Sequence, residues 1–341
     1  TLHNAYYPAL QELSLIRPIR FMSPAAMPDD GDTGKGIKKA VGTGPWVLVK
    51  TRKGEYDLFE RNERYWGTKP KLEKLMVKVI ADPNTRAVAL ETGEIDLIHG
   101  AAGHGAGQLG PDAFARFAAN PRYVTGVSRP LATRVLAVNS KREPTDDPAV
   151  RKALQHAVNK EVLAKAVFHG IEARAETLFS PDTPYCDLGL KPYIHDPALS
   201  ERLLDEAGWK RPFSGAVRVK NGRELTLDLC FIGNDPQQKA VAEVVQGDLK
   251  KIGIKVKLVG EEPDSHFNRQ KTGEFGMIFN ETWGAPYDPH SFCSSMRVPS
   301  HADYQAQLGL PMKTEIDAAI GKVLITTTEK ERRELYRYIL S

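Results

Sequence analysis

The chain has 341 residues, of which 41% are hydrophobic and 26% are charged, as in a soluble globular protein. This length exceeds what one ordinary hydrophobic core supports, so two domains are expected. The net charge is +4 at pH 7, and Lys and Arg are spread evenly among Asp and Glu. Because there is no dense basic block, we expect no nucleic-acid partner.

Local features narrow the class of protein further. No run of about 18 apolar residues occurs, so a membrane-spanning helix is not expected. The sequence begins "TLHNAYYPAL" without Met or a signal peptide, and a trimmed or mature chain would begin in the same way. Cys186, Cys230 and Cys293 lack CxxC spacing and predict neither a zinc site nor a disulfide framework. Cys230, within "LDLCFI", is expected to be a buried thiol.

The first third of the sequence predicts a helix, a β-rich region and a second helix. Lys53-Gly54 is the expected hairpin turn, and Pro83 and Gly93 are the expected start and stop of the second helix. The expected elements are a helix within 5–17, strands at 46–49, 56–61, 71–82 and 95–100, a helix at 83–93, and a flexible loop at 101–110.

The remaining two thirds predict alternating helices and strands. Val150, Leu154, Ala157, Val158 and Val162 recur at helical spacing and predict one buried face of a helix pair. The segment 224–260 predicts a strand, a helix stopped by Gly253 and a second strand, which is a βαβ unit. The other expected elements are helices at 112–121, 146–170 and 196–209, strands at 134–141 and 273–284, and two helices within 313–341.

Sequence motifs for catalysis are missing. There is no GxSxG, HExxH or P-loop, and no GxGxxG opens a helix after a strand. "VGTGPW" is Gly-rich, but a predicted strand follows it, so it is a weak signal for phosphate binding. We therefore expect no catalysed reaction.

The histidines and the one carboxylate pair favour structural roles. His156 and His169 lie in predicted helices and are interpreted as structural. His99 and His104 flank or lie in the Gly-rich loop, which is interpreted as solvated, although loose metal binding by the two stays open. Glu261-Glu262 is interpreted as a solvated turn at the end of a strand.

The stretch "NETWGAPYDPHSFCSSMRVPSHADYQAQ", 280–307, concentrates aromatic and histidine side chains in a segment without a regular apolar period. Trp283 follows a predicted buried strand, and Gly284, Pro286 and Pro289 force a rigid, irregular path. Aromatic side chains on a stiff loop after a strand commonly line small-ligand clefts in α/β proteins. An aromatic-filled turn that seals a lobe explains the stretch equally well.

Several segments carry a family resemblance that runs along essentially the whole chain. "GTGPW", "YWGTKPKLEKLMVKVIADPNTRAVALETGEIDL", "DDPAVRKALQHAVNKEVL" and "LLDEAGW" resemble the solute-binding proteins of the dipeptide, oligopeptide and nickel ABC importers. Within that family, "TWGAPYDPHSFCSSMRVPSHADYQAQ" and "AYYPALQELSLIRPIRF" are similar to the nickel-binding branch.

The resemblance implies an α/β fold, that of a two-lobed periplasmic binding protein of class II, of the peptide- and nickel-binding type. Such lobes close on their ligand by a hinge. The implied division is a part of lobe I at 1–134, including small extra subdomain elements, and lobe II at 135–341. The hinge is expected near 132–147 and a second one beyond 341, so the first lobe is expected to be incomplete in this chain.

The resemblance also implies the site residues. Trp283 and Tyr287 would line the ligand cleft, and His301 would be the one protein side chain that ligates nickel. Arg17 would form a salt bridge with carboxylates of a metal chelate, with Arg20 as the alternative. The loop at 101–110 is longer than the family pattern, and its role stays open.

The implied ligand is chelated Ni(II), transported as cargo rather than kept as a cofactor. A single histidine cannot hold Ni²⁺ tightly, since affinity follows ligand number and geometry, so a small chelator such as free histidine or a polycarboxylate must supply the other donors. Arg17 suits a carboxylate of that chelator as a planar, bidentate partner. His301 must be neutral to ligate, so binding should weaken as the pH falls.

The implied function is that of an extracytoplasmic, monomeric solute-binding protein that delivers its ligand to the permease of an ABC importer. It would reside in the periplasm, or be membrane-anchored outside the cell. A di- or oligopeptide-binding protein of the same family is the main alternative. A metal-dependent hydrolase would need at least three clustered protein ligands, and a haem- or metal-sensing partner of a receptor is a third possibility.

Overall fold

The computed structural model describes residues 3–13, 22–32, 34, 36–100, 109–285 and 287–341. The chain forms two compact units, which we call the small unit (Leu10–His99) and the large unit (Thr1–Ala9 with Gly100–Ser341). This division near residue 99 does not coincide with the predicted lobe boundary between 134 and 135. The predicted lobes are defined by how the protein closes on a ligand, whereas the two units are defined by their internal contacts. The lobes and the hinge at 132–147 therefore stay a prediction.

The small unit contains a three-stranded antiparallel sheet in the order β1-β2-β3. The elements from the start of the chain through this unit are α1 (Ala9–Glu12), η1 (Pro24–Ala26), β1 (Trp46–Arg52), β2 (Tyr56–Arg61), β3 (Lys74–Lys78) and α2 (Pro83–Glu91). Gly54 has a φ of +79°, which a glycine adopts without strain, so the predicted hairpin is confirmed. The Asp82 carboxylate accepts a hydrogen bond of 2.7 Å from the Thr85 amide and starts α2.

Two predictions for this part of the chain differ from the structure. The strand expected at 95–100 is wrong, since these residues follow α2 along an irregular path. Leu97 there is 72% exposed, and no described strand pairs with the segment, so its apolar residues have no sheet to join. The helix expected at 5–17 is shorter in the structure, where α1 covers Ala9–Glu12. Residues 14–17 lie outside the described residues.

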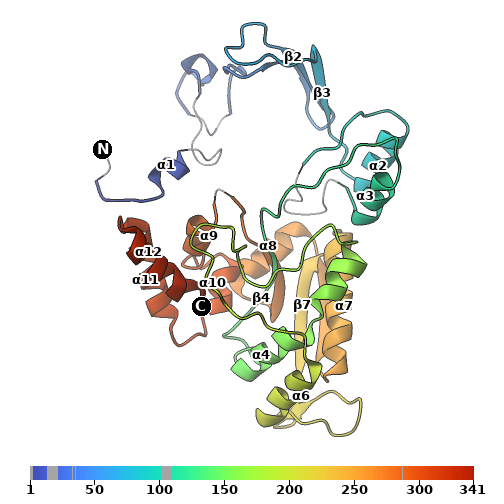
Figure 1. Cartoon of the computed structure of the whole chain (residues 1–341), viewed down its shortest axis with the longest axis vertical. Helices are drawn as coiled ribbons and strands as arrows, with labels where there is room; N and C mark the ends of the chain where they lie inside the picture. Colours follow the sequence, from blue (N-terminus) through green and yellow to red (C-terminus); the bar gives the residue numbers. More distant parts are fainter. Residues whose placement is uncertain (1–2, 14–21, 33, 35, 101–108, 286) are drawn as a thin grey trace. The chain divides into compact units, whose positions relative to one another are not determined.

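The large unit is built on a four-stranded sheet in the order β4-β9-β7-β8 (Figure 1). Its elements are α3 (Pro111–Ala118), β4 (Arg134–Val138), α4 (Pro148–Ala157), α5 (Lys160–Val162), the π-helix η3 (Leu163–Val167), α6 (Pro197–Glu206), β5 (Val219–Lys220), β6 (Arg223–Glu224), β7 (Thr226–Ile232), α7 (Pro236–Lys251), β8 (Lys255–Glu261), α8 (Pro263–Thr272), β9 (Met277–Glu281), α9 (His290–Ser295), α10 (Ala302–Gln307), α11 (Lys313–Ile325) and α12 (Glu329–Leu340). β7 and β8 pair in parallel and are joined by α7, so the predicted βαβ unit is confirmed.

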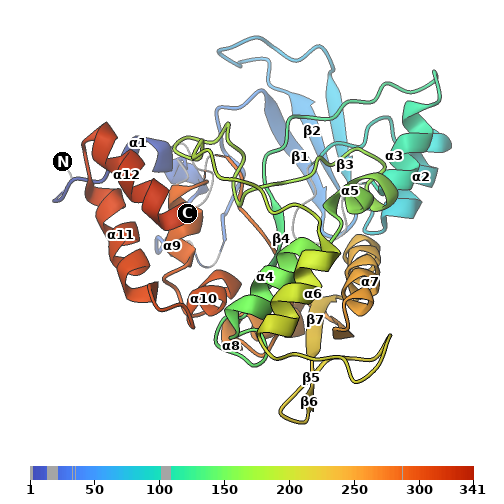
Figure 2. The same cartoon turned by 60° about the horizontal axis from the view of Figure 1, so that its bottom comes forward.

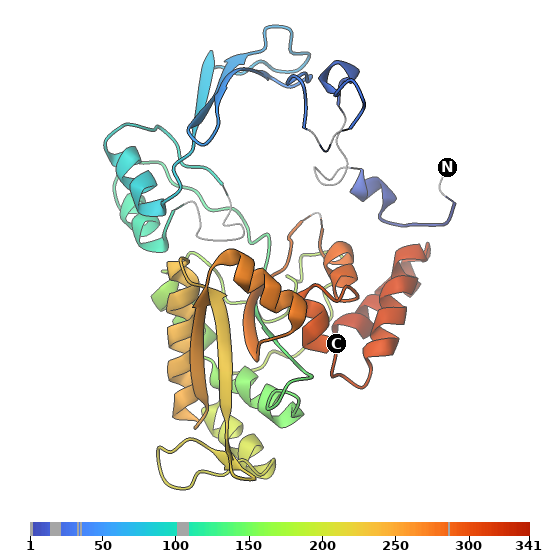
Figure 3. The ribbon, with the colours of Figure 1, turned by 180° about the vertical axis from the view of Figure 1, so that it is seen from behind.

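Alternation along β7 determines what covers each face of this sheet. Leu227, Leu229 and Phe231 belong to the main hydrophobic core together with side chains of α4, α6 and α7, which lie together in Figure 2. Cys230 belongs instead to a smaller cluster with residues of α10, and α8 lies over the same side of the sheet (Figure 3). The period of two in a strand thus divides the large unit into two layers around one sheet.

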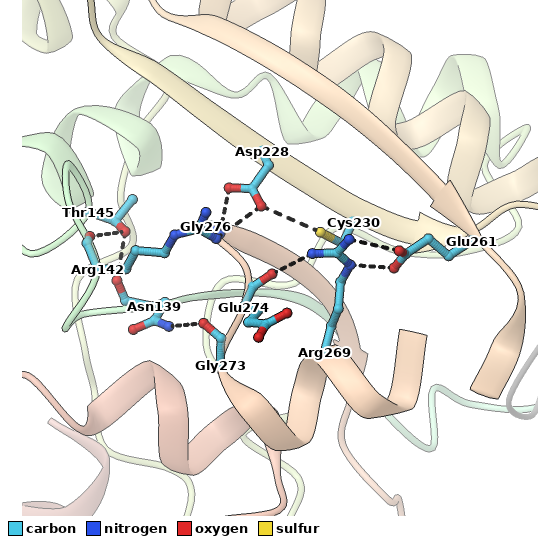
Figure 4. Close-up of polar contacts among 10 residues, drawn as sticks. All are labelled: Asn139, Arg142, Thr145, Asp228, Cys230, Glu261, Arg269, Gly273, Glu274 and Gly276. Atoms are coloured by element: carbon cyan, nitrogen blue, oxygen red, sulfur yellow. Dashed lines mark hydrogen bonds and ion pairs between the residues drawn. The ribbon is translucent and has the colours of Figure 1, made fainter. Parts of the chain in front are cut away.

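The face of β7 that points away from the main core also carries a polar network (Figure 4). The Asp228 carboxylate accepts hydrogen bonds from the Gly276 amide at 2.9 Å and from Arg142 at 3.1 Å. Arg269 on α8 forms a bidentate ion pair with Glu261, with distances of 2.5 and 2.8 Å, and this pair lowers the pKa of Glu261. The interpretation of Glu261-Glu262 as a solvated turn at the end of a strand is wrong in part. Glu261 ends β8 as expected but binds Arg269, and Glu262 is exposed and is the N-cap residue of α8.

The helical predictions of the large unit hold with one exception. α4, followed by α5 and η3, replaces the predicted helix pair, and Val150, Leu154 and Ala157 are buried as expected. Val162 is 44% exposed, because Asn159 starts α5 as a new helix and changes the direction of the apolar face. The two predicted C-terminal helices are α11 and α12, which share a second core with α9.

Cys186, Cys230 and Cys293 are buried free thiols, so the buried thiol predicted at Cys230 is confirmed. No helix in the described part of the chain is long and apolar enough to cross a membrane.

The core around β7 predicts a clear effect of truncation. Leu229 is fully buried, so Leu229→Ala should lower the free energy of unfolding by about 2–5 kcal/mol. Lys257→Ala, at an exposed position on the neighbouring β8, should change it by no more than about 0.5 kcal/mol. Urea denaturation of both variants measures this difference, and equal effects would contradict the assignment of Leu229 to the core.

Candidate functional site

The segment after β9 is held against the segment before β4 by paired hydrogen bonds. The Thr282 amide donates to the Thr133 carbonyl at 2.9 Å, and the Thr133 amide donates to the Thr282 hydroxyl at 3.0 Å. These bonds extend the antiparallel pairing of β9 with β4 past the last ladder pair. Trp283 therefore starts from a fixed point at the end of the sheet.

A buried carboxylate closes the turn that follows. Asp288 is 6% exposed, and its oxygens accept the Trp283 amide at 3.3 Å and the Gly284 amide at 3.0 Å. Burial raises the pKa of Asp288 above its usual range. Gly284 has a φ of +76°, and a Cβ there would lie 2.9 Å from the Leu131 carbonyl oxygen, so the path of the turn requires glycine.

Trp283 is the centre of an aromatic cluster. Its ring lies 6.4 Å from that of Tyr287 and 5.8 Å from that of Phe292, both in edge-to-face geometry. The His301 ring lies 5.9 Å from it at a tilt of 55°. Trp283 remains 38% exposed, so part of its indole is available to a ligand.

His301 lies at the N-cap position of α10 and is half-buried. Burial lowers the pKa of its imidazole below the ordinary value of 6.5. Within the described residues no group forms a hydrogen bond with this ring. Its burial favours the neutral imidazole, whose lone pair can bind a metal ion.

The Asp303 side chain hydrogen-bonds α10 to two neighbouring elements. Its carboxylate accepts hydrogen bonds from the Asn280 side chain at 2.7 Å and from the Ser295 hydroxyl at 3.1 Å. Burial raises the pKa of Asp303 to about 6. Asn280 lies on β9 and Ser295 ends α9, so one side chain connects three elements around His301.

The structure brings together three of the five predicted site residues, namely Trp283, Tyr287 and His301. Arg17 and Arg20 lie outside the described residues, as does His104. His99 belongs to the small unit and is exposed. No group of three or more His, Cys, Asp or Glu suited to a metal ion occurs in the part of the chain that the structure describes.

Other features of the stretch 280–307 were not predicted from the sequence. The expectation of an irregular segment is wrong in part, since it contains α9 and α10. The supporting carboxylates of Asp288 and Asp303 were also missed. The Asp288-Pro289 dipeptide is a recognisable turn signal, whereas nothing in the sequence marks Asp303 as buried.

The arrangement of the His301 and Trp283 rings determines what the candidate site can bind. One neutral imidazole next to an exposed indole offers a single metal donor and an aromatic wall. The arrangement therefore suits binding, with further donors supplied by the ligand.

Comparison with known proteins identifies the family. Residues 2–304 match the model of a family described as bacterial extracellular solute-binding proteins, family 5 middle. The chain belongs to this family. Its fold is accordingly the α/β periplasmic binding protein fold of family 5, and the predicted family and fold class are confirmed.

Three members of the family illustrate how similar the chain is to proteins of known name or structure. It is 51% identical to the nickel-binding periplasmic protein of Escherichia coli K12 over all of its 341 residues, which span 64% of that relative. It is 56% identical to NikA from Brucella suis, solved in complex with Fe(III)-EDTA, with a TM-score of 0.95, covering 100% of this chain and 67% of that one. NikZ from Campylobacter jejuni, solved with Ni(L-His), is 26% identical with a TM-score of 0.67, covering 87% and 58%. The chain thus spans just under two thirds of the length of its Escherichia coli relative.

The state of the His301 imidazole can be measured directly. Because burial lowers its pKa, the midpoint of its titration should lie below the ordinary value of 6.5, so its neutral form persists to lower pH than in an exposed histidine. NMR titration of the ring C–H signals in the ligand-free protein tests this. Trp283→Ala, which exposes the ring, should move the midpoint upward, and a midpoint above 6.5 in the unchanged protein would contradict the assigned environment.

Proposed function

We propose that this chain is the ligand-binding part of an extracytoplasmic protein that captures nickel already held by a small organic chelator. The observation that supports this most directly is the neutral imidazole of His301 lying 5.9 Å from the ring of Trp283. A protein that offers one imidazole leaves most of the coordination sphere of Ni²⁺ unfilled. The missing donors then come from the ligand, and free histidine, with its amine, imidazole and carboxylate, is a suitable chelator.

The relatives support a metal chelate as the ligand. The Escherichia coli relative is named for nickel binding, and the Brucella suis and Campylobacter jejuni structures contain Fe(III)-EDTA and Ni(L-His). Each of these two complexes is a metal ion already wrapped by an organic chelator. By this proposal Trp283 and Tyr287 contact the chelator, and His301 takes a remaining coordination position on the metal.

The proposal assigns recognition of the chelator to Arg17, with Arg20 as the alternative, and both lie outside the described residues. A guanidinium binds a carboxylate through two parallel hydrogen bonds, so it would recognise the carboxylate that a histidine or polycarboxylate chelator presents. His301 would then recognise the metal and Arg17 the chelator. Neither group alone would distinguish the complex from free histidine or from a bare cation.

The proposed partner is the membrane permease of an ABC importer, to which the protein would deliver the chelate without catalysing a reaction. The protein would act in the periplasm, or tethered outside the cytoplasmic membrane, as a monomer without nucleic acid. A di- or oligopeptide ligand is the alternative within the family, and the experiment below distinguishes it.

Calorimetric titration with nickel in the presence and absence of excess L-histidine tests the proposal. Binding should require histidine. His301→Ala should weaken it by more than the roughly 10–100-fold that loss of an outer-shell partner costs, while the circular dichroism spectrum stays unchanged. His195→Ala, at an exposed histidine, is the matched control. Binding of bare nickel, or of a dipeptide in place of nickel–histidine, would overturn the proposal.

The role of Arg17 predicts selectivity for the chelator. A charge-assisted hydrogen bond contributes about 1.5–3 kcal/mol, so Arg17→Ala should weaken binding of nickel–histidine by about 10–150-fold. Binding of nickel with free imidazole, which has no carboxylate, should be unaffected. Arg20→Ala is the comparison variant, and the opposite pattern between the two variants would assign the carboxylate to Arg20 instead.

A further inference from the structure

Asp303 occupies an unusual place among the contacts of the candidate site. It lies in the first turn of α10, two positions after His301, and its two carboxylate oxygens bind different elements. One oxygen accepts the Asn280 side-chain amide at 2.7 Å, and the other accepts the Ser295 hydroxyl at 3.1 Å. Asn280 lies on the same strand that leads, three positions later, to Trp283.

These contacts connect the two rings that would meet the ligand. β9 carries Trp283 at its end, and α10 carries His301 at its start. A second side chain also holds α10, since Gln305, which is buried, donates to the carbonyls of Lys271 and Pro299. The Asp303 side chain hydrogen-bonds the first turn of α10 directly to β9.

We propose that Asp303 is a positioning residue that sets the separation and tilt between the His301 imidazole and the Trp283 indole. The proposal rests on the proposed function, because that spacing matters only if a metal chelate is bound between the chelator-contacting indole and the imidazole. A metal–nitrogen bond is strongly directional, so a ligating ring must be held in position by groups behind it. For His301 the positioning contact is made by Asp303 on the same helix, α10, rather than by a hydrogen bond to the second nitrogen of the His301 ring.

Two substitutions of Asp303 distinguish the effect of its hydrogen bonds from the effect of its negative charge. In Asp303→Asn the remaining oxygen still accepts from Asn280, and the new amide donates to the Ser295 hydroxyl. In that variant the Ser295 hydroxyl can accept, because its one proton can turn from the position of the carboxylate to the Phe292 carbonyl, which lies 2.7 Å away. Asp303→Asn therefore keeps both contacts and removes the charge, whereas Asp303→Ala removes both contacts.

The test measures nickel–histidine binding and the ligand-field absorption of bound nickel in three forms of the protein. Asp303→Ala should raise the dissociation constant about 10–100-fold, and the spectrum of bound nickel should shift toward that of free nickel–histidine. Asp303→Asn should keep both the affinity and the spectrum of the unchanged protein. Asp228→Ala is the matched control, since that carboxylate also joins separate segments, through Gly276 and Arg142 (Figure 4). It should lower the melting temperature without altering the spectrum.

Each outcome has a definite meaning. If the unchanged protein does not bind nickel–histidine, the proposed function fails. If it binds and Asp303→Ala binds equally well with the same spectrum, the positioning role fails. If Asp303→Asn is as weak as Asp303→Ala, the carboxylate acts by its charge and the proposal is overturned. If Asp303→Ala does not fold, Asn280→Ala, which removes one of the two hydrogen bonds, should show the same spectral shift to a smaller extent, and an unshifted spectrum would overturn the proposal.

Discussion

The pairing of β9 with its two neighbours determines where the candidate site lies. β9 is antiparallel to β4 and parallel to β7, so its backbone is fixed on both sides by the sheet. The hydrogen bonds between Thr282 and Thr133 continue this constraint past the end of the strand. Trp283 and the turn after it then begin from a defined position, and the side chain of Asn280 on the same strand reaches α10.

The site also contains two buried carboxylates, Asp288 and Asp303, and burial of their charged forms costs free energy. Burial raises the pKa of Asp288 and of Asp303, which means that the surroundings oppose their charged forms. Hydrogen bonds from backbone amides at Asp288, and from Asn280 and Ser295 at Asp303, offset part of that cost. Buried polar groups of this kind specify one arrangement of the chain more than they stabilise it. They are therefore expected where a loop must hold one geometry.

Sequence reasoning succeeded where local patterns decide the structure. The alternation of "TLDLCFI" and the stop at Gly253 predicted the βαβ unit of β7, α7 and β8, because apolar period and glycine conformation act within a few residues. Trp283, Tyr287 and His301 were predicted through family resemblance, and the rings of Tyr287 and His301 lie 6.4 and 5.9 Å from that of Trp283. Their role in binding a ligand stays a prediction.

The failures share a different cause. α9 and α10 are each six residues long, shorter than an isolated helix needs for stability, so tertiary contacts such as those of Phe292 and Ala302 decide that they form. The strand expected at 95–100 failed for the converse reason, since its pattern finds no partner strand. Asp303 was missed because its importance depends on Asn280 and Ser295, which are close to it only in the folded chain.

Burial of His301 has a consequence for the kind of ligand that fits the proposed function. Its pKa is lowered because burial opposes the charged imidazolium, which leaves the lone pair of the neutral ring intact. The same burial would oppose a bare Ni²⁺ ion far more strongly, since the cost of moving an ion out of water rises steeply with its charge. A chelate whose carboxylates cancel the metal charge avoids most of this cost and still presents an open coordination position. Under the proposed function, a half-buried imidazole beside an aromatic wall would therefore favour a metal complex of low net charge over both the proton and the free cation.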